Sequence, residues 1–375
     1  DRKILKREAF LNLSWNSYLV SKVFVQFGIS AIQAFTFVLI GNAIIGIKGM
    51  FLQYWLVLFS CWAGANIIGL VISDSFKAVV TIYILIPFLV IPQIILSGIM
   101  VKFEKLNPNL SSPVSIPVYG EFLSARWGYE ALAVKQFKDN RYEQQFYAYD
   151  KAMSLARYKK DYWYIEVKGN LEKVLTDLKN NTQSRDFNNG LRVVYNEFRK
   201  NGEDYPSLKF EKYELLTPDK VTETIINEAL DRLEYIRRYF VAYYNNAKDK
   251  KDALLTTLQN IDNEALLKLR DDYTNKSLEE FVTNKNETEK IIEFKGELRQ
   301  KLDPIYMDPR HPFIKAHFYS PTKLLFGKEI DTYIVNIIVL WFMTLILYII
   351  LYFRLLKKLL DSGQTAFGKK YRASE

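Results

Sequence analysis

Four stretches of this chain carry no charged residue over the length of a bilayer. They cover residues 23–47, 49–73, 78–101 and 332–353. At about 1.5 Å per helical residue each stretch is roughly 33–38 Å long, and a hydrocarbon core is about 30 Å thick. The sequence therefore predicts a membrane protein with four helical spans.

A long polar segment separates the third span from the fourth. Helical periodicity recurs through it, including a final stretch over 278–302. We expect an all-α protein with a large, mostly helical insertion. The predicted parts are an amphipathic helix at 1–18, three membrane helices within 19–101, the insertion at 102–330, the last span at 331–353 and a basic tail at 354–375.

Basic residues gather at the two ends of the chain. The insertion has 38 Lys and Arg against 36 Asp and Glu, although the whole chain has a net charge of +9. Four spans place both ends on one side, and the positive-inside rule makes that side cytoplasmic. The insertion is then extracytoplasmic. Because the basic residues flank lipid-spanning helices, we expect them to face lipid headgroups and no nucleic acid.

The sequence contains no convincing motif for a metal or a nucleotide. Cys61 is the only cysteine and the histidines are His311 and His317, which is a poor set for structural zinc. The run 363–370 is close to a phosphate-binding loop, but Lys370 stands where a Ser or Thr would bind magnesium. We expect no catalytic residue, metal or cofactor in this chain.

The third span has two prolines, Pro87 and Pro92, each of which removes a backbone hydrogen bond. The helix is either kinked and sealed by its neighbours or deformable and part of a pathway. Polar residues in the spans are amides such as Gln93 and Asn336, without a charge. This pattern argues against ion-coupled transport, which usually requires an ionisable group within the membrane.

Three segments, in order, resemble one transporter family. Residues 91–101 with 103–108 are similar to the fifth membrane helix and its exit in type-2, G-subfamily ATP-binding cassette exporters. Residues 6–8 and 18–22 resemble the entry to the third helix of that family, and 124–132 resemble the stretch after the fifth helix. The last span takes the place of the sixth helix.

The resemblance implies the C-terminal portion of a half-transporter, driven by a nucleotide-binding domain that is fused upstream or separate and that holds ATP and Mg. It implies that an inner loop couples to this ATPase and that the fifth helix lines the pathway or its outer valve. The coupling residues are then Lys6, Arg7 and Glu8, and those of the pathway or valve are Phe88, Ile91, Pro92, Gln93, Ile95 and Leu96.

On this interpretation the chain forms a dimer, most simply a homodimer, in a bacterial inner membrane. It moves an amphipathic or lipid-like cargo, and its insertion handles cargo or docks an envelope protein. The alternative is a membrane-anchored receptor or scaffold that presents the insertion. A membrane enzyme is disfavoured, because no plausible catalytic arrangement is visible.

Overall fold

The structure is a computed structural model that describes residues 14–76, 78–106, 116–180, 182 and 185–362. The chain divides into two compact units. We call residues 1–136, 311–316 and 322–375 the membrane unit, and residues 137–310 and 317–321 the helical unit. The described residues include little of the predicted helix at 1–18 and only the first part of the basic tail.

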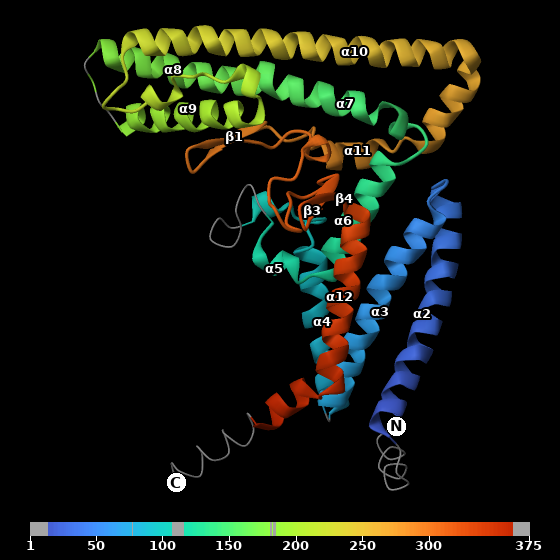
Figure 1. The fold of residues 1–375 in the computed structure, drawn as a ribbon. Helices are drawn as coiled ribbons and strands as arrows, with labels where there is room; N and C mark the ends of the chain where they lie inside the picture. The colour runs from blue at the N-terminus through green and yellow to red at the C-terminus, as the bar shows by residue number, and fades with distance from the viewer. Residues whose placement is uncertain (1–13, 77, 107–115, 181, 183–184, 363–375) are drawn as a thin grey trace, which may run out of the picture. The chain divides into compact units, whose positions relative to one another are not determined.

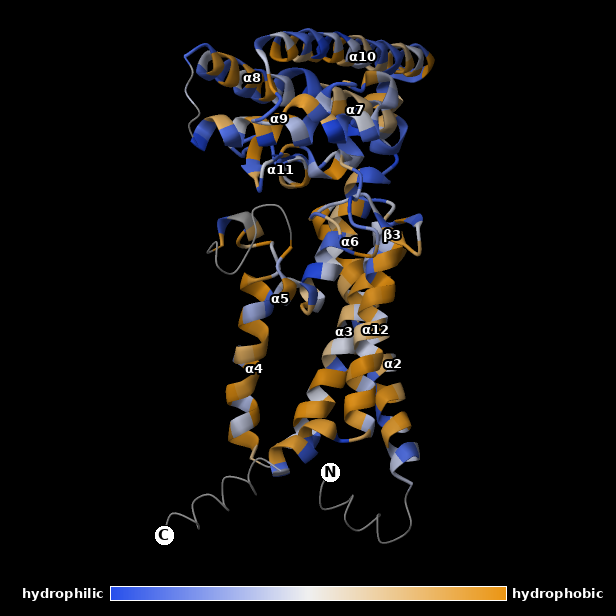
Figure 2. Ribbon diagram, turned by 60° about the vertical axis from the view of Figure 1, so that its left-hand side comes forward, coloured by the Kyte–Doolittle hydropathy of each residue, from blue (hydrophilic) through white to orange (hydrophobic). Residues whose placement is uncertain are grey.

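Three helices of the membrane unit are long and apolar enough to cross a bilayer: α2 (Trp15–Ile45), α3 (Phe51–Ser75) and α12 (Thr332–Tyr352). Figure 2 shows apolar residues along these helices and along α4 (Val79–Ile95). Helix α2 starts at Ser14, whose hydroxyl accepts a hydrogen bond from the backbone of Ser17, and ends at Gly46 with φ of 78°. The prediction of a mostly helical membrane protein is confirmed.

Helix α3 packs against both α2 and α12 (Figure 1). The ring of Phe59 in α3 lies edge-on to Phe27 of α2 and to Trp341 of α12, with centroids 6.3 and 5.8 Å apart. Asn66 donates a hydrogen bond to Ser30 across α2 and α3 at 2.5 Å. Aromatic packing and amide hydrogen bonds therefore hold these three helices together, as is common where lipid supplies no hydrophobic drive.

The third predicted span is shorter than expected. Helix α4 has 17 residues, about 26 Å at the usual rise, whereas the sequence predicted a helix over 78–101. The chain leaves the helix at Ser97 and Gly98, where Gly98 has φ of 84°. A Cβ at Gly98 would lie 2.6 Å from the ring of Phe103, so the turn also requires glycine for space. The structure thus has three candidate spans and one shorter apolar helix.

After α4 the chain forms three short or medium helices, η1 (Phe103–Lys105), α5 (Val118–Glu121) and α6 (Ser124–Lys138). The membrane unit resumes with a hairpin of β3 (Thr322–Leu325) and β4 (Lys328–Asp331), which runs directly into α12. The turn residues Phe326 and Gly327 have φ of 51° and 78°. Two consecutive positive φ angles are typical of a two-residue type I′ hairpin.

The helical unit is built on α7 (Glu143–Arg157), the π-helical turn η2 (Tyr158–Trp163), α8 (Tyr164–Lys179) and α9 (Arg185–Asp204). Helix α10 (Glu223–Tyr273) packs along α7 and α8 and breaks at Asp262, whose carboxylate caps the second part by accepting from Ala265. Two 3₁₀ turns, η3 (Pro206–Leu208) and η4 (Tyr213–Leu215), join α9 to α10. The largest fully buried side chains of the helical unit are Trp163, Phe146, Phe187, Phe198 and Phe240, all at most 1% exposed.

The second half of the predicted helix at 278–302 is a hairpin instead. Helix α11 (Lys276–Thr283) ends at Asn284, and β1 (Ile291–Phe294) pairs with β2 (Glu297–Gln300), followed by the turn η5 (Pro304–Tyr306). The reason is local, because Lys295 and Gly296 have φ of 55° and 78° and close a type I′ turn. The all-α class is corrected accordingly: the described residues hold two antiparallel hairpins among the helices.

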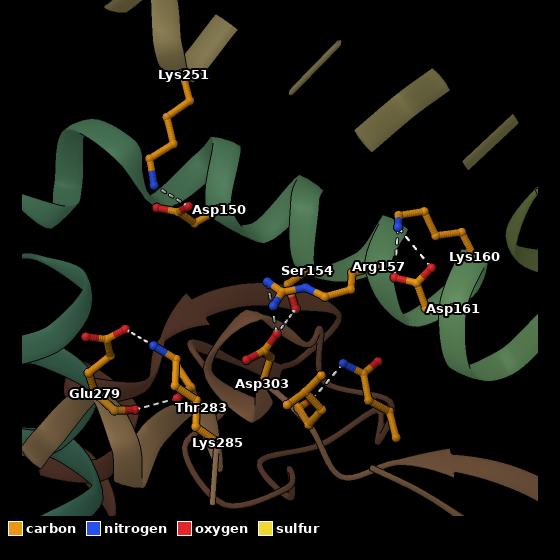
Figure 3. Close-up of polar contacts among 12 residues, drawn as sticks. Asp150, Ser154, Arg157, Lys160, Asp161, Lys251, Glu279, Thr283, Lys285 and Asp303 are labelled. Atoms are coloured by element: carbon orange, nitrogen blue, oxygen red, sulfur yellow. Dashed lines mark hydrogen bonds and ion pairs between the residues drawn. The ribbon is translucent and has the colours of Figure 1, made fainter. Parts of the chain in front are cut away.

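Ionic contacts tie α7 to its neighbours (Figure 3). Lys251 of α10 binds Asp150 of α7 at 2.5 Å. Asp303 accepts a hydrogen bond from Ser154 at 2.7 Å and lies 3.8 Å from the guanidinium of Arg157. Because Asp303 is buried, these two α7 residues fix the segment that follows the hairpin β1–β2.

Burial, then the nearby charge of Asp150, raises the pKa of Glu143 at the start of α7 to about 7. The folded state therefore binds this proton more tightly than the unfolded chain, and stability falls as the pH rises from about 4.5 to above 7. We expect Glu143→Gln to raise the free energy of unfolding at pH 8 by about 1–2 kcal/mol. Chemical denaturation at pH 8 and at pH 4.5 measures this.

The exposed Glu166→Gln serves as the control and should change stability by less than about 0.5 kcal/mol at either pH. Equal stability of Glu143→Gln and the unchanged protein at pH 8 would contradict the argument.

Candidate functional site

A cavity of about 500 Å³ lies between α3 and α4 of the membrane unit. Helix α4 has no buried side chain and so does not close onto α3. The walls are aliphatic, apart from the polar side chains of Gln93 and Ser97. The lining residues are Ala65, Ile68, Gly69, Ile72, Ile86, Leu89, Val90, Gln93, Ile94, Ser97, Ile99, Met100 and Ala125. An apolar hollow with few polar groups fits a molecule that is mainly hydrocarbon.

A second cavity, of about 210 Å³, adjoins α3, α12 and the start of α6. Ile68 and Gln93 line both cavities. The hydroxyl of Ser124, at the first position of α6, donates a hydrogen bond to Oε1 of Gln93 at 3.1 Å. The only amide side chain described on α4 is therefore held at the place where the two cavities share walls.

The sequence predicted six pathway residues on this helix, and the structure brings one of them, Gln93, to the cavities. Cavity-lining positions on α4 are 86, 89, 90, 93 and 94, which is the spacing of one helical face, and Ser97 lines the cavity just after the helix ends. The other five predicted residues line neither cavity, and Phe88 is 72% exposed on another face. Their role as a valve stays a prediction, as does ATPase coupling by Lys6, Arg7 and Glu8, which lie outside the described residues.

A buried polar cluster that the sequence did not predict joins α6, β3 and α12. It consists of Arg126, Glu130, Lys323 and Asn336, whose side chains are fully buried. Lys323 donates to Oε2 of Glu130 at 2.5 Å and to Oδ1 of Asn336 at 2.8 Å. Asn336 in turn donates to Glu130 at 2.9 Å. We call these four residues the α6–α12 cluster.

Two cations share this cluster with one fully buried carboxylate. The guanidinium of Arg126 lies 3.8 Å from Glu130 and 3.3 Å from the partly exposed Glu121, so a second carboxylate balances the charge. Trp127 contacts both cations, with Arg126 at 3.9 Å and Lys323 at 4.4 Å from its rings. Cation–π attraction is strongest where water is excluded, as here.

The pKa values in the cluster follow from burial and charge. Burial opposes ionisation of Glu130, but the nearby charges of Lys323 and Arg126 outweigh it and lower the pKa of this carboxyl. Burial lowers the pKa of Lys323 to about 8, with Glu130 acting in the opposite direction. At neutral pH the pair is therefore ionised, and the hairpin β3–β4 is fixed to α6 by a desolvated ion pair.

Part of this cluster could have been found from sequence. Arg126 and Glu130 have the i,i+4 spacing that places two side chains on one helical face. Lys323 gives no such signal, because 193 residues separate it from Glu130. The expected absence of a metal site stays an expectation. Within the described residues no group of three or more His, Cys, Asp or Glu could hold a metal ion.

Comparison with known proteins gives one family match. Residues 1–132 match the family model described as ABC-2 type transporter. No curated protein matches significantly, and no solved structure does so either. The matched range contains α2, α3 and α4, together with the cavity-lining residues Gln93 and Ser124. The match to this first third of the chain supports a membrane component of an ABC transporter, which works with an ATP-binding domain.

Proposed function

We propose that this chain is the membrane subunit of an ATP-driven exporter for an amphipathic or lipid-like cargo. The observation that carries the proposal is the aliphatic cavity beside α4, inside the range that matches the transporter family. A hydrocarbon tail fits the aliphatic walls, and Gln93 and Ser97 offer hydrogen bonds to a polar end. An amphipathic cargo has both a hydrocarbon tail for the aliphatic walls and a polar end for these two side chains.

Further parts of the proposal rest on the sequence. The transporter has its termini in the cytoplasm and the helical unit outside, in keeping with the basic ends. It works as a homodimer in a bacterial inner membrane, with the exposed face of α4 that carries Phe88 and Ile91 towards the second copy. An envelope protein is then a candidate partner for the helical unit. A cysteine placed at Lys200 should react with an impermeant maleimide from outside intact cells.

The test of ATP coupling uses the chain with its partner ATPase in membrane vesicles. We expect the double substitution Arg7→Ala and Glu8→Ala to reduce ATP-dependent transport of a fluorescent phospholipid roughly tenfold, equal to about 1.4 kcal/mol of coupling. ATP hydrolysis should persist. Lys357→Ala, a basic residue after the last span, is the matched control and should transport normally. Full transport by the double variant would remove these residues from the coupling path.

One observation favours the alternative of a receptor or scaffold. Tyr235, Tyr239 and Tyr243 follow each other at four-residue spacing on α10 and are 40–53% exposed. Exposed aromatic side chains in a row are typical of binding surfaces. Normal growth and lipid export in cells that lack the chain, together with capture of an envelope protein by the helical unit, would favour this alternative.

A further inference from the structure

A lysine is buried in the core of the helical unit and donates its hydrogen bond to a neutral side chain. Lys159 lies in the π turn η2, and its side-chain nitrogen is 4.2 Å from the ring of Trp163 and 5.7 Å from that of Tyr205. Phe240 forms a third side of this aromatic enclosure at 6.0 Å. Its hydrogen bond goes to a neutral group, Oδ1 of Asn201 in α9, at 2.9 Å.

Asn201 is more deeply buried, with 1% of its surface exposed against 8% for Lys159. Its amide nitrogen, Nδ2, has no hydrogen-bond partner in the part of the chain that the structure describes. A buried amide N–H without a partner is unfavourable, because it has lost its hydrogen bond to water. Turning the amide over would not help, because it would direct Nδ2 at the lysine, which is a donor as well. The pair therefore consists of an amine and an amide whose nitrogen is unused.

The amine is already near the carbon that it would attack. Since Oδ1 is bonded to Cγ at about 1.23 Å, the 2.9 Å hydrogen bond places Nζ of Lys159 at most about 4.1 Å from Cγ of Asn201. Reactive separations are about 3–3.5 Å. A movement of roughly 1 Å or less, which a lysine side chain makes by small torsional changes, is enough.

A buried carboxylate stands next to this pair. Glu197 precedes Asn201 by four residues on α9, so the two side chains lie on one face of the helix. Its oxygens accept hydrogen bonds from Nε1 of Trp163 and from the backbone of Leu298, both at 2.7 Å. Trp163 is also the ring closest to Lys159 among the three of the enclosure. Glu197 is thus held on the same face of α9 as Asn201, where its charge acts on Lys159.

Burial also favours the reactive form of the amine. It lowers the pKa of Lys159 to about 8, although the charge of Glu197 acts in the opposite direction. At pH 7 about a tenth of the side chain is then neutral, whereas an exposed lysine is almost entirely protonated. The aromatic rings exclude the water that would otherwise compete as a nucleophile or hydrate the ammonium.

We propose that Lys159 and Asn201 join in an intramolecular amide cross-link. The neutral amine of Lys159 attacks Cγ of Asn201, and the new bond joins Nζ to Cγ. The bond from Cγ to Nδ2 breaks, and Nδ2 leaves as ammonia after taking the proton that the attacking nitrogen gives up. Glu197 acts as the positioning residue for this proton transfer. No oxidant, reductant or further reactant is required.

The cross-link would tie the π turn between α7 and α8 to α9, across 42 residues of chain. Such a covalent bond stabilises a domain by restricting its unfolded state, as a disulfide does. Cys61, the single cysteine of the chain, lies in α3 and gives the helical unit no disulfide. A reaction between lysine and asparagine provides the same kind of restraint without cysteine.

Mass spectrometry of the full chain in detergent tests the proposal. We expect an intact mass that is lower than the sequence mass by one ammonia molecule. Trypsin should release a branched peptide in which residues 158–160, uncut after Lys159, are joined to residues 201–209. Deamidation at Asn201 and Gly202 raises the mass instead, so the two reactions are distinguishable. An intact mass equal to the sequence mass, together with two separate linear peptides, would overturn the proposal.

Three variants complete the test. Lys159→Arg and Asn201→Ala should each restore the full mass for their sequence and lower the melting temperature of the helical unit by about 10 °C. Lys160→Arg, a neighbouring lysine that pairs with Asp161, is the matched control and should keep the cross-link. Glu197→Gln should slow its formation in freshly made protein at least tenfold. Cross-linking at the full rate in Glu197→Gln would overturn the part assigned to Glu197.

Discussion

Replacing Lys323 with methionine is expected to lower the free energy of unfolding of the membrane unit by about 3–5 kcal/mol. The substitution leaves the fully buried Glu130 with Arg126 at 3.8 Å as its nearest cation, and Arg126 forms no hydrogen bond to it among the described residues. Asn336 also loses a donor to its Oδ1. The cost therefore comes from a carboxylate that is desolvated and incompletely compensated, rather than from lost packing.

Denaturation in micelles, followed by tryptophan fluorescence, measures this loss, because Trp127 lies within 4.4 Å of the lysine amine. Lys328→Met in the same hairpin is the matched control: Lys328 is exposed, and its loss should cost less than about 0.5 kcal/mol. The double variant Glu130→Leu and Lys323→Met should be destabilised by less than the sum of the single substitutions, since it leaves no buried charge of this pair behind. Strict additivity would contradict an ion pair as the source of the effect.

Filling the larger cavity is expected to reduce transport about tenfold, which corresponds to about 1.4 kcal/mol of lost cargo binding. Gly69 lines the cavity, and a Cβ added there meets no atom within 4 Å. Gly69→Leu therefore places apolar atoms in the space of the cargo, from a position where the first added atom does not clash. Membrane vesicles that contain the chain and its partner ATPase, loaded with a fluorescent phospholipid, give the rate of ATP-dependent movement.

Gly41 in α2 provides the matched control. A Cβ at Gly41 also meets nothing within 4 Å, and the residue lines neither cavity. Gly41→Leu makes the same chemical change in a membrane helix and should leave transport unaltered. Equal transport rates for Gly69→Leu and Gly41→Leu would show that the cavity is not part of the transport path.

The apolar helices were predictable from sequence because lipid imposes a simple rule, a long run without charge. Their ends were not, since they depend on single contacts. The third helix stops six residues before position 101, at a turn where Phe103 packs against Gly98. Gly98, Ile99 and Met100 are uncharged, so the hydropathy pattern includes them in the span. The pattern does not show that the ring of Phe103 packs against Gly98 and ends the helix.

The turn residues of the two hairpins are visible in the sequence, but the spacing of the apolar residues around them favoured a helix. Lys295-Gly296 and Phe326-Gly327 each separate two short runs, but charged residues interrupt the alternation of apolar side chains. Helical spacing over 278–302 then gave the better match. Only the Arg126 and Glu130 pair of the α6–α12 cluster could be predicted, because Lys323 lies far along the chain from Glu130, in one of those hairpins. Gln93 was named because the resemblance places the fifth helix along the pathway; it lines both cavities, and its role in transport stays a prediction.

Strand β4 ends at Asp331, and α12 begins at Thr332. The same aspartate caps the helix by accepting a hydrogen bond from the backbone of Tyr333 at 2.9 Å. No linker residue therefore separates the last membrane helix from the hairpin that contains Lys323. A piston-like stroke of α12 along its axis would pull directly on the lysine, so the salt bridge to Glu130 must either travel with the helix or break at each stroke.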